Sequence, residues 1–260
     1  MEILFFTFFL GLAVGSFLNC LIYRLESGES FLKGRSFCPK CKHLLSWKDL
    51  IPILSFVFLK GKCRYCQQKI SLQYPLVEIS TAILFLAPHF FYQNFNFFEL
   101  FFYWIFVSCS IVIFVYDLKN YSIPDKVLLF AIFSALIYRL FRAWNFGKWE
   151  FSEILIPILS ATFSSLFFFL IWFFSRGKWM GQGDIELVFF LGLILGWPKI
   201  LVALLIAFFS GATIGLGLVM AGKKSLKSEI PFAPFLVGAT IFSLFFGQKI
   251  VDWYLFFVIE

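Results

Sequence analysis

The sequence predicts an all-α polytopic membrane protein with about eight transmembrane helices and a small cytoplasmic lobe between the first two. Hydrophobic residues make up 61% of the chain and charged residues 14%, whereas soluble domains are about 45–50% apolar and about 25% charged. The mean hydropathy is +0.89. The apolar residues form runs close to the ~20 residues that cross a bilayer as a helix, and the polar residues are concentrated in one segment near the N-terminus.

The candidate spans lie at about residues 3–24, 73–92, 98–116, 125–143, 152–175, 184–197, 199–221 and 231–248. The run at 184–197 is short, because 14 residues at 1.5 Å each give about 20 Å against a hydrocarbon core of ~30 Å. Either this helix begins earlier, through Trp179, or Asp184 lies below the headgroups. We expect the second arrangement, with Asp184 in a hydrated, recessed cytoplasmic cavity.

Lysine and arginine are most frequent in the cytoplasmic loops of membrane proteins. With the polar segment in the cytoplasm, 17 of the 22 basic residues fall on the inner side. The basic residues on the outer side are Arg139, Arg142, Lys148, Lys199 and Lys249. The net charge of +7 therefore indicates topology and attraction to anionic lipid, and not a nucleic-acid partner. The first run has no positive n-region and no cleavage site, so we expect a retained span and not a signal peptide.

The end of the first span carries small and polar residues at helical spacing: Gly15, Ser16, Asn19 and Tyr23. Two interpretations fit this face. Small residues allow close helix packing, and an asparagine can bond across a helix interface. Alternatively, the same face lines a hydrated groove that receives a substrate.

The polar segment at 26–72 carries two C-x2-C pairs, Cys38 with Cys41 and Cys63 with Cys66. Two such pairs are typical of a tetrahedral zinc site with four thiolates, and a reducing cytoplasm disfavours disulfides. A site with four protein ligands has no open coordination position, so this Zn²⁺ would be structural. The alternative is a loop with free or redox-active cysteines.

The second span opens with Pro75, which suits the first turn of a helix, and with Glu78. Glu78 lies about one turn inside the apolar run. It could complement the positive end of the helix or face a polar cavity.

Two acids lie at the cytoplasmic ends of apolar runs. Asp117 closes one run, and Asp184 opens another behind Gly181 and Gly183, which indicate irregular or closely approached backbone. An aspartate at membrane depth costs about 2.5–3.5 kcal/mol, so such a residue is functional by default. Asp125 follows a proline and is expected to be a structural residue in the first turn of a helix.

Asp117 and Asp184 in one pocket would hold a single proton between them, because two adjacent carboxylates do not both ionise readily. The ionised acid can take a proton from water, and the protonated acid can polarise a peptide carbonyl. The cytoplasmic segments contain no Ser/His or Cys/His arrangement for nucleophilic catalysis. We therefore predict that the two aspartates form one proteolytic site.

Several segments carry a resemblance to a known family: Gly15–Leu25, the two cysteine pairs, Tyr74–Glu78, Asp117 with Ile123–Asp125, Gly181–Asp184 and Ile230–Phe235. In this order the chain resembles the prepilin peptidases, or type IV leader peptidases, which are GxGD-type membrane aspartic peptidases. The resemblance implies an inner-membrane endopeptidase with its active site facing the cytoplasm. Its substrates would be prepilins and pseudopilins of type IV pili and type II secretion.

By motif position, the resemblance makes Asp117 and Asp184 the catalytic residues. It also implies N-methylation of the new N-terminus with S-adenosylmethionine, for which no binding residues are identified. The chain departs from the family at Glu186, where a lysine is usual, and at Trp179 and Ala233, where glycine is often found.

The expected organisation is a first span at 1–25, a zinc lobe at 26–72 and a peptidase core at 73–260. One alternative function is an ion- or proton-coupled transporter that uses the intramembrane aspartates. A non-enzymatic membrane scaffold with a docking lobe is another, but it leaves the two aspartates unexplained.

Overall fold

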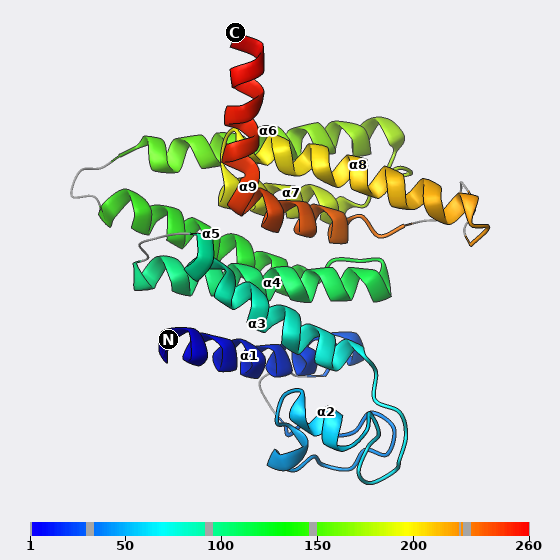
Figure 1. Cartoon of the computed structure of the whole chain (residues 1–260). Helices are drawn as coiled ribbons and strands as arrows, with labels where there is room; N and C mark the ends of the chain where they lie inside the picture. The colour runs from blue at the N-terminus through cyan, green and yellow to red at the C-terminus, as the bar shows by residue number, and fades with distance from the viewer. Residues whose placement is uncertain are drawn as a thin grey trace. The chain divides into compact units, whose positions relative to one another are not determined.

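The computed structural model describes residues 2–29, 34–91, 96–145, 150–223, 225 and 230–259 (Figure 1). Within these ranges the regular structure is helical, apart from two isolated β-bridges. The long helices are α1 (Glu2–Ser27), α3 (Gln73–Phe91), α4 (Phe97–Asn120), α5 (Asp125–Asn145), α6 (Ser152–Ser175), α7 (Gln182–Leu195), α8 (Lys199–Met220) and α9 (Ala233–Ile259). The lobe between α1 and α3 contains a 3₁₀ helix, η1 (Trp47–Asp49), and the short α2 (Leu54–Phe58).

Within the described ranges, seven helices are long and apolar enough to cross a membrane: α1, α3, α4, α5, α6, α8 and α9. The prediction of an all-helical, multi-pass membrane protein is therefore confirmed. The eighth predicted span forms α7, whose 14 residues are too few to cross a ~30 Å core. This helix begins at Gln182, so the predicted alternative of an earlier start through Trp179 is wrong.

The chain divides into two compact units, residues 1–112 and 113–260, and the division falls within α4. In the first unit α1 packs closely on α3. A Cβ atom at Gly15 would lie 2.7 Å from the backbone of Glu78, so only glycine allows this approach. Asn19 is buried and donates to the carbonyl oxygen of Tyr74 on α3, at 3.0 Å. These two residues of the predicted polar face therefore serve helix packing.

The second unit is organised around α7, which packs against α5, α6, α8 and α9. Its fully buried residues point in all directions around the helix axis: Leu187, Val188, Phe190, Leu191 and Leu193. A Cβ atom at Gly192 would lie 2.5 Å from the backbone of Ala161 on α6. Because α7 is enclosed by protein, its length need not match the bilayer, which explains how a helix of this hydropathy can be so short.

Candidate active site and metal centre

Asp117 lies in the last turn of α4 and is only 5% exposed. Its Oδ2 atom accepts a hydrogen bond from the backbone N–H of Ala233, at 3.2 Å. Ala233 is the first residue of α9, so its amide is one of those that a helix leaves unsatisfied at its N-terminus. The positive end of the α9 dipole therefore faces this carboxylate.

The start of α9 is defined by two prolines and a ring cluster. Pro231 and Pro234 have no N–H, so of residues 231–234 only Phe232 and Ala233 carry an amide that can donate. The Phe232 ring packs against Phe208 and Phe168, at centroid distances of 5.3 and 6.2 Å. This aromatic contact with α8 and α6 holds the beginning of α9, and therefore the Ala233 amide, in position.

Asp184 is half-buried in the first turn of α7, three residues after the N-cap Gly181. Its carboxylate receives a backbone hydrogen bond from Gly181. An acid at this position reaching back to the N-cap amide is one half of a capping box. A Cβ atom at Gly183 would lie 3.2 Å from the Cβ atom of Ile123, so the predicted close backbone approach is present at Gly183.

The fold places Asp117 of α4 within electrostatic range of Asp184 of α7. Both belong to the second compact unit. Each carboxylate is held by a backbone amide at a helix N-terminus, Asp117 by α9 and Asp184 by its own helix. Two acids that interact in this way can hold one proton between them and exchange its position.

Three other acids singled out in the sequence lie outside this pair. Asp125 is exposed and is the first residue of α5, as expected for a structural acid. Glu186 is half-buried on α7. Glu78 is 7% exposed and accepts the N–H of Ile53, at 2.8 Å, and a hydrogen bond from Ser16. Glu78 is therefore bonded within the first unit, between α1, α3 and the lobe.

The four lobe cysteines converge as the sequence predicts. The sulfur atoms of Cys38, Cys41, Cys63 and Cys66 all lie within 4.8 Å of one another, and those of Cys38 and Cys66 are 4.0 Å apart. Cys38 and Cys63 are buried, and none of the four forms a disulfide. A group of four thiols at this spacing can hold one metal ion.

The two cysteine pairs lie in turns of the same geometry. In the first turn Lys42 has φ 59° and donates its N–H to the Cys38 carbonyl, at 2.8 Å. In the second, Gln67 has φ 57° and donates to the Cys63 carbonyl, at 2.9 Å. An isolated β-bridge closes each turn, Phe37 with Leu44 and Lys62 with Lys69. The repeated turn presents both sulfurs of each pair to one centre.

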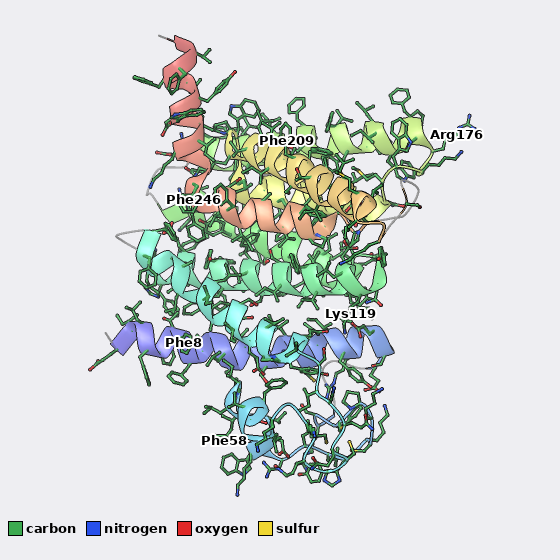
Figure 2. All side chains as sticks on the ribbon, turned by 45° about the vertical axis from the view of Figure 1, so that its right-hand side comes forward. Phe8, Phe58, Lys119, Arg176, Phe209 and Phe246 are labelled. Carbon is green, nitrogen blue, oxygen red and sulfur yellow. The ribbon has the colours of Figure 1, made fainter. Side chains whose placement is uncertain are left out.

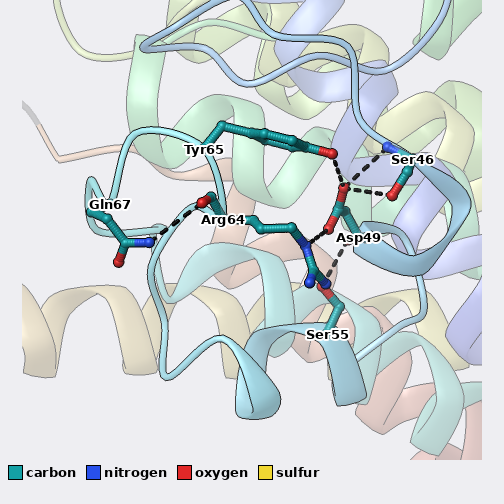
Figure 3. Close-up of polar contacts among 6 residues, drawn as sticks. All are labelled: Ser46, Asp49, Ser55, Arg64, Tyr65 and Gln67. Atoms are coloured by element: carbon teal, nitrogen blue, oxygen red, sulfur yellow. Dashed lines mark hydrogen bonds and ion pairs between the residues drawn. The ribbon is translucent and has the colours of Figure 1, made fainter.

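A polar network centred on Asp49 joins η1 to the second cysteine turn (Figure 3). The carboxylate accepts hydrogen bonds from Arg64 Nε at 2.7 Å, Ser46 Oγ at 2.7 Å and Tyr65 Oη at 3.0 Å. Burial of this side chain alone would raise its pKa, but the bonds from Arg64, Ser46 and Tyr65 outweigh burial and lower the pKa of Asp49 to about 2. Ser55 of α2 donates to the Asp49 carbonyl, at 2.8 Å.

One buried charge in the second unit was not singled out by sequence reasoning. Arg139 of α5 donates from Nε to the Leu193 carbonyl and from Nη2 to the Ile194 carbonyl, both at 2.7 Å. These carbonyls lie at the C-terminal end of α7, the helix that carries Asp184 in its first turn. The only sequence feature that could have indicated this role is the position of an arginine inside an apolar run. From the charge distribution, Arg139 counted only as one of the basic residues on the outer side.

The multi-pass helical fold, the paired acids of α4 and α7 and the four-cysteine lobe together define the class of a polytopic membrane peptidase. The chain belongs to the type IV leader peptidase family, whose family model matches residues 104–216. A second model, the Bacterial Peptidase A24 N-terminal domain, matches residues 9–92. The first match contains both aspartates, and the second contains all four lobe cysteines.

Curated relatives are similar over nearly the whole chain. The prepilin leader peptidase/N-methyltransferase of Bacillus subtilis (strain 168) is 32% identical, with 95% of this chain and 96% of the relative covered. Proteins of the same name from Legionella pneumophila and Aeromonas hydrophila are 32% and 31% identical. The match to the Legionella protein covers 94% of this chain and 91% of that protein. The match to the Aeromonas protein covers 95% of this chain and 92% of that protein. No solved structure matches this chain.

Proposed function

We propose that this protein is a membrane aspartic endopeptidase that removes the leader peptide of type IV prepilins and pseudopilins. The observation that carries the proposal is the convergence of Asp117 and Asp184, each on a backbone amide of a helix N-terminus. The names of the relatives support the choice of substrate. No relative reported above is a transporter, and no contact in the described residues favours that alternative.

Asp117 and Asp184 would act as one acid–base pair. The ionised carboxylate takes a proton from water, whose oxygen attacks the peptide carbonyl carbon. The protonated carboxyl gives its proton to the carbonyl oxygen, and a tetrahedral diol forms. The diol collapses as the protonated carboxyl gives its proton to the leaving nitrogen and the C–N bond breaks. The other carboxylate takes the proton of one diol hydroxyl, so the pair again holds one proton. The Ala233 amide keeps the Asp117 oxygen in place throughout.

The proposed location is the inner membrane, with both acids and the lobe on the cytoplasmic side. The charge distribution supports this orientation, since 17 of the 22 basic residues fall on that side. We also retain the organisation of a first span at 1–25, a lobe at 26–72 and a peptidase core at 73–260.

We propose that the metal of the lobe is a structural Zn²⁺ held by Cys38, Cys41, Cys63 and Cys66. A tetrahedral zinc with Zn–S bonds of about 2.3 Å needs sulfurs about 3.8 Å apart. The 4.0 Å separation of the Cys38 and Cys66 sulfurs is close to that value, and no pair exceeds 4.8 Å. The metal would hold the two cysteine turns together, because four thiolates leave no position for a substrate.

We further propose that the protein methylates the amine released by cleavage, as the names of the relatives indicate. S-adenosylmethionine would supply the methyl group from its sulfonium sulfur to the amine nitrogen. We assign none of the described residues to this cofactor. The peptidase mechanism above uses only the two aspartates, water and the Ala233 amide.

The test is cleavage of a purified prepilin by wild type, Asp117→Asn and Asp184→Asn, each shown to be folded. We expect each variant to lose about 10²–10⁴-fold in turnover, the usual contribution of a positioned acid or base. Asp252→Asn is the matched control, because Asp252 is an exposed aspartate of the same unit. Near-normal turnover in either active-site variant would exclude the paired mechanism. Mass measurement of the product with and without S-adenosylmethionine tests methylation separately.

A further inference from the structure

The lobe carries an exposed apolar surface that the proposed function does not use. We define the α2 surface as Trp47 of η1 with Leu54, Val57 and Phe58 of α2. Trp47 is 72% exposed and Phe58 is 80% exposed. Leu54, Val57 and Phe58 stand at i, i+3 and i+4, so they share one face of α2. Figure 2 shows Phe58 at the outer edge of the lobe.

The α2 surface is held beside α1 and α3, close to the first turns of α3. Ile53, the residue before α2, donates its N–H to Oε2 of Glu78, at 2.8 Å. Glu78 lies five residues into α3, which is about 8 Å along the helix axis. The same carboxylate is bonded to Ser16 of α1. Figures 1 and 2 both show α2 beside the length of α1 and not past its end.

The backbone at this junction is constrained. Ile53 has φ 60°, a positive value that a β-branched residue adopts only when its surroundings require it. The Glu78 carboxylate binds the amide of this residue, and Ser55 fixes the next turn to Asp49. The position of α2 beside the spans is therefore determined by several contacts.

The charges around the α2 surface fit a lipid headgroup layer. Lys48 lies next to Trp47, and Lys60 and Lys62 follow α2 directly; all three are exposed. Apolar side chains bordered by lysine are typical of helices that lie about 5–10 Å deep in the interface of an anionic membrane. Near such a surface each lysine is attracted to the acidic lipid.

We propose that the α2 surface inserts into the headgroup and upper acyl region of the bilayer, with anionic phospholipid as its partner. The lobe is then attached to the membrane by α2 as well as by α1 and α3. The proposal rests on the multi-pass fold and not on the peptidase activity. The insertion would restrain the lobe at the membrane surface independently of the metal.

The test places a fluorescent reporter on this surface in the full-length protein. Phe58→Trp adds one tryptophan to the eight present at a position with ample space, and the difference from wild type reports position 58. The protein is reconstituted in vesicles of phosphatidylcholine and phosphatidylglycerol. The added emission is quenched with lipids brominated high on the acyl chain and, separately, with aqueous iodide. Leu44→Trp, on an exposed residue of the first cysteine turn, is the matched control.

We expect the lipid-to-iodide quenching ratio at position 58 to exceed that at position 44 by about twofold or more. Lys60→Glu, or vesicles without phosphatidylglycerol, should reduce the ratio at position 58. Equal ratios at the two positions would overturn the proposal. Free access of iodide that disappears only when a prepilin is added would also overturn it, because the partner would then be a protein.

Discussion

Arg139 offers the most direct test of how α7 is held. A helix leaves its last four carbonyls without partners in its own backbone. Here the Gly192 carbonyl accepts from Gly196, at 2.9 Å, and those of Leu193 and Ile194 accept from Arg139. The arginine side chain is only 11% exposed. Replacing it by methionine keeps most of the apolar volume and removes both donors.

The expected cost follows from these two bonds. A buried carbonyl that loses its partner costs about 1–3 kcal/mol, so two cost about 2–6 kcal/mol. Removing the guanidinium also removes its desolvation penalty, so we expect Arg139→Met to lower the free energy of unfolding by about 2–4 kcal/mol. Arg139→Lys should lie between methionine and wild type, because one ammonium cannot reproduce the two parallel bonds of the guanidinium fork.

The assay is denaturant unfolding of the purified protein in mild detergent, with prepilin cleavage measured on the same samples. Arg142→Met is the matched control, since both arginines approach Glu153, Arg139 at 4.0 Å and Arg142 at 3.4 Å in a partly exposed contact. Such a pair contributes about 0–1 kcal/mol. If Arg139→Met stays within about 0.5 kcal/mol of wild type at an unchanged m-value, the arginine does not hold the end of α7.

Three further predictions concern the two sites. Cys41→Ser should reduce zinc in the purified protein well below one ion per chain, whereas Cys109→Ser, outside the cluster, should leave it unchanged; a metal-free wild type would refute the zinc site. Gly183→Ala should overpack Ile123 at a cost of about 1–3 kcal/mol, lower turnover and be partly rescued by a second change, Ile123→Ala; lack of rescue would show that the contact is not the cause. The pKa of Asp49 is lowered from 3.8 to about 2, so its stabilisation is complete above about pH 4 and lost as the pH falls through about 2. The difference in unfolding midpoint between wild type and Asp49→Asn should therefore be constant from about pH 5 to about pH 8, and a slope in that range would contradict the low pKa.

The sequence predicted those features of the fold that depend on composition along the chain. Hydropathy located the seven helices long enough to cross a membrane. It also marked the run at 184–197, but it could not distinguish a lipid-facing span from a helix enclosed by protein. That distinction depends on α5, α6, α8 and α9 surrounding α7, which is long-range packing that no local pattern records.

For two polar residues the sequence allowed two roles each. Contacts between distant segments decide between these roles. Asn19 could pack helices or line a groove, and its bond to the Tyr74 carbonyl favours packing. Glu78 could complement a helix end or face a cavity, and it instead binds the Ile53 amide of the lobe. In both cases one partner is a backbone group of a distant segment, whose position cannot be inferred from residue types.

The same reasoning explains why the candidate acids were predictable and their partners were not. A carboxylate at membrane depth is conspicuous because of its cost, so Asp117 and Asp184 could be singled out one by one. The group that holds Asp117 is the amide of Ala233, which lies where the family often has glycine. Any residue except proline supplies that N–H. Ala233 is fully buried, and its N–H still reaches Asp117. This departure from the family pattern therefore leaves the hydrogen bond to Asp117 intact, and the pair can form with alanine at that position.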